Sequence, residues 1–574
     1  MAQVAMNRLN EMMTSDPEQG YGAGVIDAEV KYRGRGFGLK CEKFFALAFI
    51  VGFLVYVGSG VLIFTQTVVE FELQDDNGVE IPVPTFTDEF QKEIDECLSG
   101  SGGNIRRLQT EAFECDNVFC VFTKAPETLV IMCGATPILA LLWLVAMYFV
   151  PRGIVWSSVA ISVLIPIFLG VVFILDDAGD TNIAIVLFAY GGILALLAYW
   201  TRAKIERAAR HLKTTILAIR ENICLIPSVG ILEVFLLGVF AMHFFFLVAN
   251  GKVFEVVQFP GGCGITRPAY ATNILKFQNF WLLWIVAYLN SAKLTATAMH
   301  MGGWYFGQQN RSALRSVKTS VTTSIPALSI GSLITAVVDK IVEVATQDFW
   351  WTNPGGCALR LLYACFQGCI MAMTRFAIIT HAFTGGSFFS SGRDAYQVMK
   401  KNFVGGFVTN RVGRSVVANV SQLVALGIGL FCWHLIDKDN NFTTLKDFLS
   451  GKLFDSLLVT VLFIFGYMYL VLRPMFTILL IVLVGDLVGE AISSGGGGAA
   501  FAPMAGLFSS CVVYIIFSFL GDVVLDTLDT MFLAYAVKGP GSGAPQGMAT
   551  AKVYHMLTDD VPERIETANA ISYA

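Results

Sequence analysis

Charged side chains interrupt several of the most apolar stretches of the sequence. Glu233, Lys293 and Arg375 each lie inside an apolar run long enough to cross a bilayer, and Asp526 and Asp529 lie inside another. A charge held in hydrocarbon costs about 3 kcal/mol or more, so one that is retained usually faces a water-filled cavity or an oppositely charged partner. These residues are therefore candidates for substrate binding or for buried ion pairing.

The three aspartates of the last apolar run share a helical spacing. Asp522, Asp526 and Asp529 are four and three residues apart, which places them on one face of a helix. That face cannot point toward lipid. It either lines a water-filled path or pairs with cations from neighbouring helices.

Aromatic residues supply a second kind of candidate chemistry. Trp284 and Tyr288 lie one helical turn apart inside the run 280–300. Tryptophan and tyrosine rings attract a cation through their quadrupoles, so a cage of such rings would suit an alkylammonium ion. The alternative is that these rings belong to the core or to an interfacial belt.

Lys293 lies in the same run and would oppose a bound cation. A protonated lysine about 5 Å from a quaternary ammonium would repel it by about 3 kcal/mol at an effective dielectric constant of 20. Lys293 follows Trp284 by nine positions and Tyr288 by five, which rotates it by about 180° and about 140° from them on a helix. The spacing therefore favours the opposite helix face and an ion pair with Glu233 or Asp526.

The elements that carry these residues are predicted to be membrane-spanning helices. The chain has 574 residues, of which 55% are hydrophobic and 14% charged, and its mean hydropathy is +0.63. We expect an all-α fold, a polytopic integral membrane helical bundle of about 10–12 transmembrane helices. The apolar runs are 44–64, 129–150, 154–175, 183–200, 223–249, 280–300, 321–344, 357–383, 415–436, 453–472, 475–491 and 505–536.

The distribution of Lys and Arg predicts the orientation. Basic segments at 202–220, 311–318 and 392–414 all fall on the cytosolic side when the amino terminus is cytosolic, and the acidic loop 65–125 falls outside. Both termini are then cytosolic. The predicted organisation is an amino-terminal tail (1–42), a transmembrane domain (43–537) and a carboxyl-terminal tail (538–574).

The predicted outer loops contain candidate modification sites. Cys97, Cys115, Cys120 and Cys263 lie in such loops and could form one or two disulfides in an oxidising compartment, with free thiols as the alternative. Asn441 begins an Asn-Phe-Thr sequence and is a candidate glycosylation site.

Other classes of function lack support in the sequence. Paired CxxC motifs, HExxH, GxSxG and a phosphate-binding loop are all absent. We therefore expect no metal, no cofactor and no enzymatic activity. The net charge of −5, with its signs spread through the loops, predicts no nucleic-acid partner; the expected partners are the lipid bilayer and a small molecule.

Three segments of the chain resemble the choline transporter-like proteins, which are polytopic carriers of choline and, in some members, ethanolamine. The first spans Trp284, Ala298 and the sequence Trp304-Tyr305-Phe306. The second is residues 374–402, which begin "TRFAIITHAFTGGSFF". The third is residues 525–537, "LDTLDTMFLAYAV".

This resemblance implies a transporter that moves a cationic amine by alternating access and needs no ATP. It suggests Trp284 and Tyr288 as the cation-facing wall, with Asp529 and Glu233 as counter-charges. Arg375 would be a structural or gating residue that pairs with an acid, as would Lys293 with Glu233 or Asp526. The expected location is the plasma membrane, with an organellar membrane as the alternative.

The sequence also departs from the family pattern. Glutamine positions of the family become Ala292 and Lys293, its small-residue run becomes Ala298-Met299-His300-Met301, and the segment 453–491 resembles an inserted hairpin. Two alternatives therefore stay open. One is a transporter of the same fold with a changed substrate, and the other is a structural or accessory membrane protein.

Overall fold

The computed structural model describes seven continuous segments of the chain and several short pieces. The segments are residues 37–66, 136–175, 181–251, 268–307, 312–347, 354–398 and 501–538. The predicted spans 453–472 and 475–491, and most of 415–436, lie outside the described residues. The predicted number of ten to twelve spans, the segment boundaries and the cytosolic placement of both termini therefore stay predictions.

The described part of the chain is built from helices. They are α3 (Phe37–Thr65), α7 (Thr136–Phe149), α8 (Pro151–Leu175), α9 (Thr181–Trp200), α10 (Arg202–Glu221), α11 (Leu225–Gly251), α12 (Ala269–Tyr305), α13 (Ala313–Thr322), α14 (Ile325–Gln347), α15 (Pro354–Thr384) and α20 (Phe501–Lys538). Residues 388–398 form a further short helix. The predicted helical membrane bundle is thereby confirmed as the fold class.

Two antiparallel hairpins lie in the connections between helices. β1 (Val69–Glu70) pairs with β2 (Thr85–Phe86), and β3 (Glu255–Phe259) pairs with β4 (Gly262–Thr266). The β3–β4 hairpin joins α11 to α12, with Glu255 opposite Thr266. Neither hairpin extends the helical core.

Four helices of the described residues are long and apolar enough to cross a membrane. Their spanning parts are Glu42–Thr65, Pro151–Phe168, Leu225–Leu247 and Ile325–Val342. The helices α12, α15 and α20 are longer still, at 37, 31 and 38 residues, but they are less uniformly apolar. Their buried charged residues Lys293, Asp526 and Asp529 contact neighbouring helices, because the interior of the bundle can pair them and lipid cannot.

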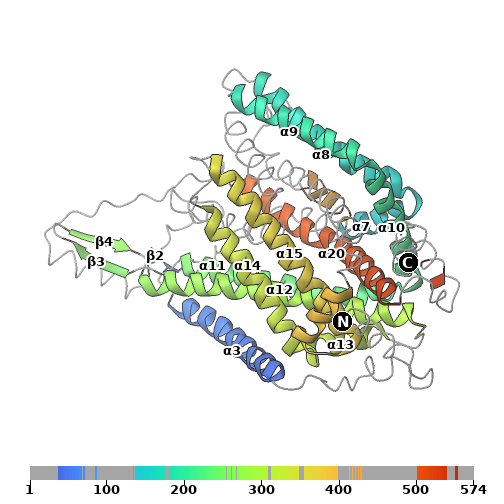
Figure 1. The fold of residues 1–574 in the computed structure, drawn as a ribbon. Helices are drawn as coiled ribbons and strands as arrows, with labels where there is room; N and C mark the ends of the chain where they lie inside the picture. Colours follow the sequence, from blue (N-terminus) through green and yellow to red (C-terminus); the bar gives the residue numbers. More distant parts are fainter. Residues whose placement is uncertain are drawn as a thin grey trace.

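Helix α12 forms the centre of the bundle. It packs against α3, α11, α13, α14, α15 and α20, and most of its residues from Trp281 to Tyr305 are buried. Figure 1 shows these helices crossing one another, with the α8–α9 pair along one side of the bundle. Gly307, with φ +88°, follows the end of α12 in the left-handed conformation that commonly terminates helices.

Two helices occur where the sequence suggested basic cytosolic loops. α10 carries buried Ile205, Leu212, Ile216 and Ile219 along one stripe and contacts α7, α8, α9 and α20. α13 is a second amphipathic helix. A search for uniformly apolar runs misses both, because only one face of each helix is apolar.

Helix α3 approaches α12 closely at a glycine. A Cβ atom built on Gly52 would lie 1.7 Å from the indole ring of Trp281, so a side chain at this position must displace that ring. We expect Gly52→Ala to lower the free energy of unfolding by about 1–3 kcal/mol, the usual cost of overpacking. Thermal unfolding in detergent measures the change.

Gly58 supplies the matched control for this prediction. It lies on the same helix, and a Cβ built there meets no atom within 4 Å. Gly58→Ala should therefore leave the unfolding temperature unchanged or raise it slightly. Equal effects of the two substitutions would contradict the close approach at Gly52.

Candidate functional site

Lys293 forms a buried ion pair with Glu233. Lys293 Nζ lies 2.6 Å from Glu233 Oε2, and the two side chains are only 5% and 8% exposed. The pair joins α12 to α11. Lys293 Nζ also lies 5.7 Å from the ring centroid of Phe519 on α20, so the charge contacts an aromatic face as well.

Breaking this pair should be more harmful than removing it. Lys293→Met leaves the Glu233 carboxylate buried without its cation, which typically costs about 3–5 kcal/mol. We expect the double variant Lys293→Met, Glu233→Gln to recover most of that stability, because neither member of the pair is then left as a buried charge without the other. Thermal unfolding of the two single variants and the double variant measures the coupling between the residues.

Arg375 bridges two aspartates of α20. Its Nη2 donates to Asp526 Oδ1 and its Nε donates to Asp529 Oδ2. The three-residue spacing places both carboxylates on the helix face toward α15, where the planar guanidinium can reach them together. For Asp526 and Asp529, the shared acidic face thus pairs with a cation from a neighbouring helix.

Asp522 lies one turn before Asp526 on the same helix and differs from it. Its side chain is half-buried, and within the described part of the chain it forms no hydrogen bond and no ion pair. Its charge acts on Lys293, Glu233 and Arg375. The spacing of the aspartates indicated a shared face, but it did not single out Asp522 as the unpaired member.

These six side chains form what we call the ionic layer of the bundle. Four of them are acids and two are cations, so the layer carries a formal excess of two negative charges when all six are ionised. An interior with this excess favours a cationic guest. The members are Glu233, Lys293, Arg375, Asp522, Asp526 and Asp529.

An aromatic layer lies next to the ionic layer along α12. Phe49 stacks on Tyr288 at 4.4 Å between ring centroids, and Trp281 stacks on Trp284 at 4.6 Å. Phe49 also meets Trp284 edge to face at 5.4 Å. The two rings predicted from the sequence thus belong to one cluster, which Phe49 of α3 and Trp281 complete.

Trp284 and Lys293 contact different helices, as their angular separation suggested. The indole Nε1 of Trp284 donates to Ser329 O at 3.2 Å and to Ser332 Oγ at 3.1 Å, both on α14. Lys293 instead faces α11 and α20. The lysine charge is therefore neutralised on a side of α12 away from the Trp284 ring.

A polar layer lies beyond the aromatic one, toward the start of α12. Tyr56 OH and His243 Nδ1 are 3.0 Å apart, and the two rings are stacked. Gln278 Nε2 donates to Ser59 Oγ at 3.2 Å. The separation of fifteen positions between Gln278 and Lys293 corresponds to about 22 Å of helix rise. Three layers, polar, aromatic and ionic, therefore follow one another along α12.

Comparison with known proteins identifies the family. The family model described as "Plasma-membrane choline transporter" matches residues 185–484, which is just over half of the chain. The protein belongs to this choline transporter family. The match includes Glu233, Lys293 and Arg375 as well as the aromatic residues of α12, while α20 lies beyond it.

Individual relatives of this choline transporter family member are distant. Protein PNS1 from Gibberella zeae is 20% identical over 51% of this chain and 56% of its own length. Choline transporter-like 2 from Anopheles gambiae is 24% identical over 32% of this chain and 24% of its own length. Choline transporter-like protein 1 from Caenorhabditis elegans is 22% identical over 30% and 25%. The chain thus spans about half of the first relative and about a quarter of the other two.

The choline transporter family is described as a family of plasma-membrane transporters. This description names a transporter rather than an enzyme and places the family in a membrane. The substrate itself does not follow at this level of identity.

Several predicted sites lie outside the described residues. Cys97, Cys115, Cys120 and Asn441 are among them. The backbone of Cys263 lies on β4, but its side chain is not described. The proposed disulfides and the glycosylation site therefore stay predictions.

Proposed function

We propose that this protein carries choline or a related amine such as ethanolamine across the membrane by alternating access, without ATP. The observation that carries the proposal is the ionic layer, which has an excess of acids and follows the aromatic layer along α12. The names of two of the relatives point to the same substrate class.

The proposed site assigns different tasks to the aromatic and acidic residues. Trp284 and Tyr288 hold the quaternary ammonium by cation–π attraction, since this group cannot donate hydrogen bonds. We assign the counter-charge to Asp522, which has no ion-pair partner among the described residues. Glu233 and Asp529, the counter-charges suggested by the sequence, each bind a protein cation in this structure. In the proposal they act on the substrate only through the net electrostatic field of the ionic layer.

The pairing of Lys293 removes the main electrostatic objection to a cationic substrate. An unpaired lysine would oppose binding by about 3 kcal/mol at 5 Å. Glu233 lies 2.6 Å from Lys293, so the two charges nearly cancel and the net repulsion on a cation in the aromatic layer is small. The proposal therefore gives Lys293 a structural role rather than a substrate contact.

The proposed gating role of the ion pairs follows from the helices they join. Lys293–Glu233 links α12 to α11, and Arg375 with Asp526 and Asp529 links α15 to α20. Alternating access requires such helix pairs to move relative to one another around a central site. An inside-negative membrane potential of 100 mV contributes about 2.3 kcal/mol toward cation entry, so no nucleotide is required.

Uptake into reconstituted vesicles tests this proposal. Purified protein is placed in liposomes with a potassium gradient and valinomycin, and labelled choline and ethanolamine are offered separately. We expect choline accumulation that depends on an inside-negative potential and falls sharply in Trp284→Ala. Absence of accumulation of either amine by folded, reconstituted protein would refute the proposal in favour of a changed substrate or an accessory role.

The proposed location is the plasma membrane, in line with the description of the family. Labelling of intact cells with a membrane-impermeant amine reagent tests it. Surface labelling of the protein is expected, whereas labelling that appears only after permeabilisation would place the protein in an organellar membrane.

A further inference from the structure

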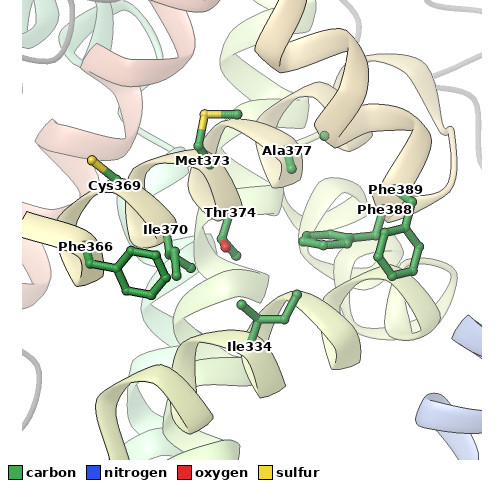
Figure 2. Close-up of a pocket in the computed structure, with 10 residues that line it drawn as sticks. Ile334, Phe366, Cys369, Ile370, Met373, Thr374, Ala377, Phe388 and Phe389 are labelled. Atoms are coloured by element: carbon green, nitrogen blue, oxygen red, sulfur yellow. The ribbon is translucent and has the colours of Figure 1, made fainter. Parts of the chain in front are cut away.

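A groove of about 420 Å³ lies between α14, α15 and the short helix of residues 388–398. Figure 2 shows Ile334 from α14, Ile370 and Met373 from α15, and Phe388 lining it. The lining is apolar apart from Thr374 and Cys369. Phe366 and Phe389 at its rim are 61% and 53% exposed, so the groove opens toward the surroundings of the bundle.

The surroundings of this groove are the membrane interior. Ile334 lies within the spanning part of α14, Ile325–Val342. Toward the other end of α14, Gln367 Nε2 donates to Asp339 Oδ1 at 2.6 Å, a contact between α15 and α14 that closes the groove in that direction. Because the bilayer supplies hydrocarbon chains rather than water at this depth, an apolar chain is the available guest.

The short helix of residues 388–398 adds a polar anchor at the other end of the groove. Phe389, Arg393 and Tyr396 are four and three residues apart and all exposed, so they share one outward face. Arg393 directly follows Gly392, which lines the groove. In the described part of the chain, Arg393 forms no hydrogen bond and no ion pair.

This combination of features matches one kind of ligand. Aromatic and basic residues on one exposed helix face are typical of a membrane interface, where the aliphatic part is buried and the charge meets headgroups. The basic segments of the sequence predict that this end of α15 is cytosolic. The cytosolic leaflet is the one that carries anionic lipids.

We propose that the groove binds one acyl chain of an anionic phospholipid from the cytosolic leaflet, with the lipid phosphate on Arg393. The bound lipid would stabilise the contact between the short helix of residues 388–398 and α3, because Phe388 both lines the groove and donates its N–H to Glu42 Oε1 at 2.7 Å. This inference does not depend on the identity of the transported substrate.

Photo-crosslinking tests the site. The full chain is reconstituted into phosphatidylcholine vesicles containing phosphatidylserine with a diazirine in its acyl chain, and crosslinked peptides are mapped by mass spectrometry. We expect crosslinks to concentrate on groove residues such as Ile370 and Met373. Met373→Trp, which fills the groove, should remove them.

The headgroup contact is tested separately at an exposed position, where folding is not at risk. Arg393→Gln should reduce the preference for phosphatidylserine over phosphatidylcholine by about fivefold, which corresponds to the roughly 1 kcal/mol that one cationic side chain gains near an anionic surface. Lys318→Gln removes an exposed cation from α13 and should leave the preference unchanged.

Three outcomes would overturn the proposal. Crosslinks spread evenly around the bundle would indicate ordinary boundary lipid. Equal effects of Arg393→Gln and Lys318→Gln would indicate a general surface charge effect. Crosslinking of the groove to a second copy of the chain, instead of to lipid, would make this face a contact between protomers.

Discussion

Replacing Arg375 with alanine should destabilise the protein by about 3–5 kcal/mol and abolish transport. The guanidinium donates to both Asp526 and Asp529, whose side chains are only 6% and 3% exposed. Without the arginine, two buried carboxylates on one face of α20 lose the cation that binds both of them. Removing one partner of a buried ionic group usually has this magnitude because the remaining charge is neither solvated nor paired.

Thermal unfolding and vesicle uptake, measured on the same preparations, check this expectation. The triple variant Arg375→Met, Asp526→Asn, Asp529→Asn removes the whole group and should recover much of the lost stability, since no charged member of this group is left without its partner. If the single variant unfolds like the native protein, Arg375 does not neutralise these aspartates.

The triple variant also distinguishes a structural role of these three charges from a role in gating. A triple variant that folds well but does not transport indicates that the charges themselves are needed during the transport cycle. A triple variant that transports normally indicates that they only hold α15 and α20 together. Arg375→Lys retains the charge but loses the planar guanidinium that reaches both carboxylates. Its stability and its transport rate should therefore lie between those of the native protein and the alanine variant.

Pairing inside the bundle was partly predictable from the sequence. The cost of a buried charge and the angular separation of Lys293 from Trp284 predicted an ion pair on another face of α12. The choice between Glu233 and Asp526 as its partner required the arrangement of α11 and α20 around α12. The spacing of residues gives the angular position of a side chain on its own helix. It does not give the identity of the helix that packs against that face.

Contacts between distant segments were beyond sequence reasoning. Tyr56 and His243 are 187 positions apart, and Phe49 joins the aromatic cluster from a different helix than Trp284. Helices α10 and α13 were also missed, because each has one apolar stripe and no long apolar run. The long spans were predictable because hydrocarbon imposes a length and a composition on them.

Asp522, the acid of the ionic layer that has no ion-pair partner in the described part of the chain, gives the sharpest test of the proposed substrate. Asp522→Asn should raise the KM for choline at least tenfold. A charge about 5 Å from a quaternary ammonium contributes about 3 kcal/mol at an effective dielectric constant of 20, and each 1.4 kcal/mol corresponds to a tenfold change. Stability should change little, because within the described segments Asp522 forms no ion pair or hydrogen bond that the substitution could break.

Two comparisons distinguish a counter-charge from a structural role for Asp522. Asp522→Glu keeps the charge and should restore most of the affinity for choline. Dimethylbutanol, the uncharged carbon isostere of choline, should compete for the site equally well in the native protein and in Asp522→Asn. If the substitution weakens the neutral isostere as much as choline, Asp522 shapes the site without meeting the cation. The excess negative charge of the ionic layer would then contribute to the packing of the helices and not to the binding of the substrate.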